Sequence, residues 1–225
     1  MLNLTTAALF LIGTHFGIAS TSLRAELVAR IGEGAYRAVY SLLALVALVW
    51  LVTAWRAAPL VPLWPVGAGL RHLALALMPL AFLFLVCAVT ASNPTAIGQR
   101  PDPDATPAMG MIRITRHPFM WGIGLWALLH LAANGDVASV LFFGSLAALA
   151  LVGTFLIDAR RTRENAPGWG VFLQATSNLP FVAILERRQK LVASEIGLWR
   201  VALALAAYVV LFWLHPWLFG VSPLG

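Results

Sequence analysis

Long stretches without a charged side chain are the feature that most constrains the fold of this chain. With histidine counted as neutral, uncharged runs cover 1–23, 38–55, 57–70, 72–99, 117–135, 137–157, 165–185 and 201–225. A helix needs about 20 residues to cross the ~30 Å hydrocarbon core of a bilayer, so several of these runs are long enough to span it. Charged residues make up only 11% of the chain, compared with about 25% in soluble domains. The sequence therefore excludes a soluble globular enzyme, and its 60% hydrophobic content excludes a disordered chain.

Two of the eight runs contain residues that prevent a lipid-exposed helix. The 57–70 run carries Pro59, Pro62 and Pro65, which lack backbone N–H groups and break helices. The 165–185 run is rich in Asn, Gly, Pro and hydroxyl residues, which favours an interfacial or re-entrant segment. Six spans remain, at about 3–21, 38–55, 71–90, 118–134, 137–157 and 198–218.

A two-residue link, Gly135-Asp136, joins the fourth and fifth predicted spans. So short a link forces an antiparallel helical hairpin, with Gly135 at positive φ and Asp136 capping the next helix. Gly122 and Gly124, and the pair Gly13 and Gly17, favour close approach between helices. We predict an all-α polytopic membrane bundle of about six transmembrane helices that forms a single domain over 1–225.

The basic residues are distributed unevenly between the two sides of this predicted bundle. One side holds Arg56 and Arg71. The other side holds thirteen basic residues, namely Arg24, Arg30, Arg37, Arg100, Arg113, Arg116, Arg160, Arg161, Arg163, Arg187, Arg188, Lys190 and Arg200. The positive-inside rule places these thirteen in the cytoplasm and both termini outside, which is the periplasm for a bacterial inner-membrane protein. The net charge of +6 therefore reflects membrane orientation and contact with lipid, and it does not indicate nucleic-acid binding.

Histidines are the polar groups of the predicted spans that are best suited to chemistry, because no Asp or Glu lies deep in any of them. The five are His15, His72, His117, His130 and His215. Without carboxylate or thiolate partners, imidazoles in a membrane bundle have two plausible uses. They can ligate a haem between helices, or they can form interhelical hydrogen bonds. Composition alone leaves both uses open.

Helix geometry limits which histidines could bind one iron. His117 and His130 lie thirteen residues apart, which is ~20 Å along a helix and places them on largely different faces. His15 and His130 would differ in depth by roughly 10 Å in straight, untilted helices. By depth, His72 or His215 is as good a partner for His130.

Arg116, His117 and Pro118 indicate a helix start with two basic side chains beside it. Proline suits the first helical turn, where its missing N–H costs nothing. A helix N-terminus with two basic groups can bind a phosphate, a carboxylate or a lipid headgroup. The alternative is that both side chains only anchor the fourth span at the membrane surface.

Several motifs together resemble the NnrU family, over about residues 10–180. They are His15-Phe16-Gly17 with Ser20 and Arg24, Gly32-Glu33-Gly34-Ala35-Tyr36-Arg37 with Tyr40-Ser41, Thr115-Arg116-His117-Pro118, Trp126 with His130, Asn134-Gly135-Asp136, and Ser177 with Pro180. The family is named for a part in the expression of nitrite and nitric oxide reductases during denitrification, so the resemblance implies denitrification enzymes as partners.

The NnrU family is similar to the 15-cis-zeta-carotene isomerase of plants and cyanobacteria, a membrane haem b enzyme that isomerises a hydrophobic polyene. This similarity implies haem b as cofactor and His15 and His130 as its axial ligands. It also implies a cysteine three residues before the second histidine as an alternative ligand, but this chain has Ala127 there. On this reading Arg116 and His117 hold a propionate or a phosphate, and Trp126 packs against the macrocycle.

Two other function classes compete with the haem protein. One is a non-enzymatic membrane scaffold that assists assembly of denitrification enzymes, with the histidines as interhelical hydrogen-bonding groups. The other is a membrane methyltransferase of the isoprenylcysteine carboxyl type, whose Arg-His-Pro motif opens a helix near the methyl donor. This chain lacks the acidic pair and the Tyr-rich segment that follow the motif in those enzymes, and it has only the isolated Glu164.

Overall fold

The computed structural model describes residues 1–96, 108–165 and 167–224. Within them the chain is helical and forms no named strand, which confirms the all-α prediction for this part of the protein. Its elements are α1 (Leu2–Thr14), the π-helical turn η1 (His15–Ala19), α2 (Ser22–Ile31), α3 (Glu33–Arg56), α4 (Ala68–Thr90), α5 (Met111–Ile114), α6 (Pro118–Asn134), α7 (Val137–Arg163), α8 (Trp169–Ala175), α9 (Val182–Leu185), the 3-10 turn η2 (Ala193–Glu195) and α10 (Leu198–Phe219).

In the part of the chain that the structure describes, five helical segments are long and apolar enough to cross a membrane, so the chain is a multi-pass membrane protein. They are Leu2–Ala19, Glu33–Arg56, Ala68–Thr90, Val137–Arg163 and Leu198–Phe219. The sixth predicted span, 118–134, is the 17-residue helix α6. The count of six spans and the orientation of the termini therefore stay predictions.

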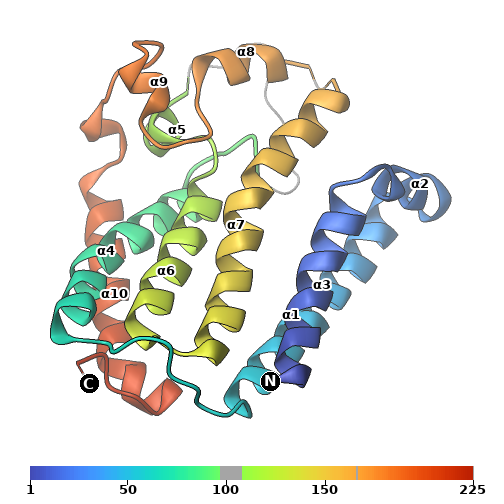
Figure 1. Ribbon diagram of the computed structural model, residues 1–225. Coiled ribbons are helices and arrows are strands. Elements are labelled where there is room, and N and C mark those ends of the chain that lie inside the picture. The colour runs from blue at the N-terminus through green and yellow to red at the C-terminus, as the bar shows by residue number, and fades with distance from the viewer. Residues whose placement is uncertain (97–107, 166, 225) are drawn as a thin grey trace.

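The long helices pack in a row in which α6 lies in the middle (Figure 1). Helix α6 packs against α4 on one side and α7 on the other, while α10 covers α4 and the α1–α3 hairpin packs on α7. Both termini lie at one end of the bundle, which we call the terminal end. The other end carries α2, α5, α8 and α9, and we call it the arginine-rich end.

Two glycines allow α6 to fit between its neighbours. A Cβ atom at Gly122 would lie 2.8 Å from Leu85 of α4, and one at Gly124 would lie 2.7 Å from Leu151 of α7. The close approach predicted for these glycines is confirmed. The same prediction is wrong for Gly13 and Gly17, because no neighbouring atom of the described residues lies within 4 Å of a Cβ built at either position.

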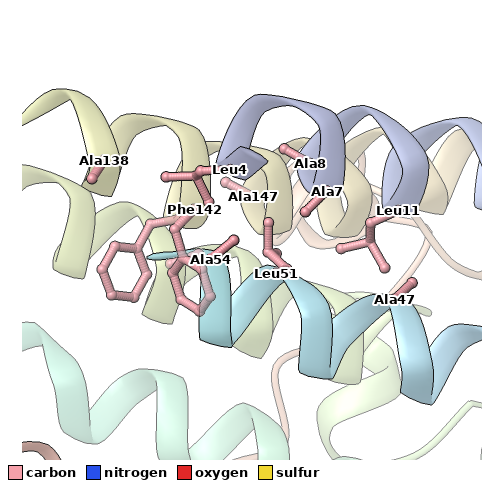
Figure 2. Packing of buried hydrophobic residues seen from close by; sticks show 12 residues of the cluster. Leu4, Ala7, Ala8, Leu11, Ala47, Leu51, Ala54, Ala138, Phe142 and Ala147 are labelled. Carbon is pink, nitrogen blue, oxygen red and sulfur yellow. The ribbon is translucent and has the colours of Figure 1, made fainter. Parts of the chain in front are cut away.

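Small residues also form the apolar core between α1, α3 and α7 (Figure 2). Leu4 and Leu11 of α1 and Leu51 of α3 lie among buried alanines of all three helices. In lipid, where apolar burial drives helix association weakly, such close contact supplies the van der Waals attraction that holds helices together. Phe142 of α7 closes this core and stacks on Trp55, with ring centroids 4.8 Å apart.

The turn between α6 and α7 has the predicted form. Gly135 has φ 70°, and the Asp136 carboxylate accepts a hydrogen bond from the Ser139 N–H at 2.9 Å. The proline-rich segment that follows α3 is not helical, as predicted, and crosses the terminal end beside this turn. Leu63 N–H donates to the Gly135 carbonyl at 2.8 Å, so the segment fixes the hairpin from outside.

The described residues of the segment predicted to be interfacial, 165–185, lie at the arginine-rich end. This segment contains the short helices α8 and α9, which are joined by the turn at residues 176–181. Whether it enters the bilayer stays a prediction.

Candidate functional site

The candidate residues fall into two groups at opposite ends of α6. The histidine pair consists of His130, near the end of α6, and His215 of α10. The carboxylate cluster consists of Arg116 and His117 before α6, Asp158 of α7 and Asn178 of the turn between α8 and α9.

The histidine pair places two imidazole rings side by side at the terminal end. The ring centroids of His130 and His215 lie 6.5 Å apart, with an angle of 17° between the ring planes. The Nδ1 atom of His130 lies 2.9 Å from the Trp126 carbonyl, and that of His215 lies 2.8 Å from the Val221 carbonyl. A carbonyl only accepts hydrogen bonds, so in the neutral rings Nδ1 carries the proton and Nε2 keeps its lone pair. This is the arrangement that backbone partners impose on metal-binding histidines.

Aromatic side chains surround the histidine pair. Phe143 stacks on His130 with centroids 5.0 Å apart, and Trp126 lies 4.7 Å from the same ring. Phe219 lies 4.7 Å from His215. The predicted contact residue Trp126 is therefore part of this apolar environment.

His15 and His72 lie outside this group. His15 opens the π-helical turn at the far end of α1, where its Nδ1 contacts the Leu11 carbonyl at 2.8 Å and its ring meets Tyr40. Leu4 shares the core with Phe143, and His15 lies eleven residues further along, about 16 Å at the helical rise. His72 is exposed at the start of α4. The structure thus brings His130 and His215 together and does not bring His15 beside His130.

The carboxylate cluster is organised around Asp158. Arg116 donates to its Oδ2 from Nε at 2.9 Å and from Nη2 at 2.6 Å. His117 Nε2 lies 2.8 Å from Oδ1, and Asn178 Nδ2 donates to Oδ2 at 3.1 Å. All four residues are buried or nearly so, and charge-assisted bonds of this kind are the stronger ones in proteins.

Local backbone structure places these groups. Pro118 begins α6, as predicted, and leaves His117 at the cap position. The Arg116 N–H donates to the Ser177 carbonyl at 2.9 Å, while Thr115 Oγ1 and Trp121 Nε1 both donate to the Asn178 carbonyl, at 2.6 and 2.9 Å. The turn between α8 and α9 is thereby tied to the start of α6.

Burial controls the charge of His117. Loss of hydration lowers its pKa from the ordinary value and outweighs the opposing effect of Asp158, so the ring stays neutral near pH 7. Its Nε2–H then donates to Asp158. Among the described residues the buried Nδ1 atom has no hydrogen-bond partner, and the same holds for Asn178 Oδ1.

An internal carboxylate occupies the position for which the sequence suggested an external anion. Arg116 and His117 were predicted to hold a propionate or phosphate, and in the structure Asp158 accepts hydrogen bonds from both. Sequence reasoning missed Asp158 because the fifth span was ended at the first charge, whereas α7 continues to Arg163. Asp158 would have been found only if the predicted helix had been allowed to continue into a charged final turn.

Two further features bear on the chemistry. Among the described residues no group of three or more His, Cys, Asp or Glu could hold a metal ion, so a protein-only metal centre is not formed there.

An apolar groove of about 200 Å³ lies between α1 and α7 and is lined by Thr5, Ala8, Leu9, Ile12, Val140, Leu141, Gly144 and Ser145. Phe143, which stacks on His130, follows two of these lining residues along α7.

Comparison with known proteins gives a family and partial relatives. The sequence model of the family described as "NnrU protein" matches residues 3–223. The 15-cis-zeta-carotene isomerase, chloroplastic, of Zea mays is 37% identical over 82 residues, which cover 36% of this chain and 22% of that protein. The protein of the same name from Arabidopsis thaliana is 35% identical over 82 residues, with the same shares covered. The similarity thus spans about a fifth of these relatives. No solved structure matches the chain.

Proposed function

The chain belongs to the NnrU family, and from that premise we propose that it is a haem b-binding isomerase of a hydrophobic polyene in the bacterial inner membrane. The partial similarity to two proteins named as carotene isomerases supports the reaction class. The observation that carries the proposal is the histidine pair, with both Nδ1 atoms bound to backbone carbonyls. An association with denitrification enzymes stays a prediction.

The residues of the histidine pair fit haem. Haem iron is commonly held by neutral imidazole, and the rest of the macrocycle needs an apolar surround. His130 and His215 supply the imidazoles from two different helices, and Trp126, Phe143 and Phe219 supply the aromatic surface. When bound, haem supplies an iron centre for one-electron chemistry next to a conjugated chain. Trp126 and Phe143 pack on the His130 ring, and the apolar groove between α1 and α7 offers a place for part of an apolar substrate.

The axial partner of His130 is the point on which family resemblance and geometry differ. Resemblance assigns His15, whereas the structure places His215 beside His130. We propose His130 and His215 as the ligands, because these two rings already lie side by side. Ligation by His15 would instead require α1 to move.

An absorption spectrum of the detergent-purified protein from haem-sufficient cells tests this proposal. We expect a Soret band that is lost in His130→Ala and in His215→Ala. His72→Ala is the matched control and should keep the band, because His72 is exposed at the head of α4. Loss of the band in His15→Ala with full retention in His215→Ala would replace our ligand pair with the one implied by the resemblance.

The reaction class needs its own measurement. Purified protein incubated with a cis-polyene should change the ratio of isomers, as resolved by liquid chromatography, and His130→Ala should not. A colourless wild type would contradict haem binding, and a coloured but inactive one would contradict the isomerase and favour the scaffold.

A further inference from the structure

The chain has three tyrosines, Tyr36, Tyr40 and Tyr208, and the structure treats their hydroxyl groups differently. Tyr208 donates its hydroxyl hydrogen to the Leu75 carbonyl at 3.1 Å. The hydroxyls of Tyr36 and Tyr40 are buried and have no hydrogen-bond partner among the described residues. A buried polar group without a partner is unfavourable, so these two hydroxyls indicate a missing ligand atom.

Both tyrosines lie on α3, and Tyr40 contacts a segment where the backbone departs from regular α-helix. Their rings stack with centroids 5.7 Å apart on the first two turns of α3, and the Tyr40 and His15 rings form a T-shaped pair with centroids 5.5 Å apart. His15 begins the π-helical turn η1, a rare conformation that is frequent at functional sites. Open space borders this turn at Gly17.

The charges around the tyrosines are predominantly positive. Three arginines share two carboxylates there: Arg24, Arg37 and Arg160 pair with Glu33 and Glu164. The Arg24 guanidinium lies over the Tyr36 ring, 5.5 Å from its centroid. The surplus of cations favours an anionic ligand.

The neighbouring surface is apolar and faces away from the protein. Val39 and Leu42 of α3 are each 63% exposed and flank Tyr40 along the helix. A ligand that bridges the arginines and this surface needs a charged head and a hydrocarbon chain. Anionic phospholipids have both, and basic sites between membrane helices on the cytoplasmic side bind such headgroups.

We propose that Tyr36, Tyr40 and Arg24 bind the phosphate of an anionic phospholipid at the arginine-rich end. Phosphate oxygens accept hydrogen bonds from the two hydroxyls, while Arg24 supplies charge. The acyl chains lie along the exposed face of α3. This proposal is independent of the haem site, which lies at the terminal end.

Native mass spectrometry of the delipidated full-length protein in detergent tests it. Titration with phosphatidylglycerol should show at least tenfold tighter binding than titration with phosphatidylcholine. The double variant Tyr36→Phe/Tyr40→Phe should lose at least tenfold in affinity for phosphatidylglycerol. Tyr208→Phe is the matched control and should bind as the wild type does. Equal affinity of the double variant and the wild type, or equal binding of the two lipids, would overturn the proposal.

A second measurement checks the premise without lipid. Removing a hydroxyl that has no partner costs nothing, so the delipidated double variant should melt at or above the temperature of the wild type. A lower melting temperature would show that protein or water already satisfies the hydroxyls, and it would overturn the proposal. Titration with inorganic phosphate distinguishes a lipid headgroup from free phosphate. If inorganic phosphate bound as tightly as phosphatidylglycerol, the proposal that the phosphate belongs to a lipid would be overturned.

Discussion

At the residue scale, Asp158 is the centre of the buried polar contacts at the arginine-rich end. Replacing it with Asn leaves the Arg116 charge buried without its partner, because the Arg116 side chain is only 10% exposed. Loss of one member of such a pair costs about 3 to 5 kcal/mol. We expect the free energy of unfolding in detergent to fall by about 3 kcal/mol in Asp158→Asn.

The control is Glu186→Gln, which breaks the exposed pair with Arg188 and should change the free energy of unfolding by less than about 1 kcal/mol. Equal effects of the two variants would contradict a buried role for Asp158.

Glu195 gives a prediction about pH. Its carboxylate accepts hydrogen bonds from Arg113 Nε and from the Gly110 N–H, each at 2.7 Å, and Arg113 is the main cause that lowers its pKa from 4.5 to about 2. Because the pKa is lower in the folded state, this stabilisation is complete above pH 4.5 and is lost as the pH falls toward about 2. The difference in melting temperature between the wild type and Glu195→Gln should therefore shrink across that range. Glu26→Gln, at an exposed site on α2, is the control, and a difference that is independent of pH would rule the mechanism out.

How far individual residues could be predicted depended on how far their partners lie along the chain. Pro118 and the Gly135 turn were predictable because each obeys a local backbone rule. Arg116 and His117 were recognised as a basic pair, but their partner Asp158 lies about forty residues later. His130 was recognised as a candidate ligand, but His215 was not singled out as its neighbour. Only the packing of α10 decides which histidine lies beside His130.

At the element scale, α6 is the helix whose shape the bundle depends on most. A methyl group at Gly124 would clash with Leu151, and overpacking of this kind typically costs about 1 to 3 kcal/mol. We expect Gly124→Ala to lower the free energy of unfolding by about that amount. Gly144→Ala on α7 meets no atom within 4 Å and should instead stabilise by up to ~1 kcal/mol through helix propensity. Effects of the same sign and size would show that Gly124 is not a contact residue.

The helices themselves were more predictable than their contacts. Apolar length fixed the spans to within a few residues at most ends, and α3 and α7 differ most because both extend into charged turns. The order of packing was not predictable, because in lipid the faces that meet helices and the faces that meet acyl chains are equally apolar. A small residue marks a contact face only where another helix lies against it. This holds for Gly122 and Gly124 but not for Gly13 and Gly17.

At the scale of the whole molecule, the position of the termini depends on whether α6 crosses the membrane. Helix α6 connects the arginine-rich end to the terminal end and lies between α4 and α7 over its length (Figure 1). If it spans with them, the number of crossings is even, and both termini lie on one side. The asymmetry of thirteen basic residues against two then places that side outside.

Reporter fusions test this arrangement. Alkaline phosphatase fused after Leu224 should be active, because that end is then periplasmic, while a fluorescent protein inserted in the exposed 187–188 turn should be bright in the cytoplasm. The reverse result at both sites would show that the basic residues do not orient the bundle. A cytoplasmic C-terminus together with a cytoplasmic 187–188 turn would show that α10 does not cross. In that case His215 would not lie beside His130 near the end of α6, so the topology measurement also bears on the proposed haem ligands.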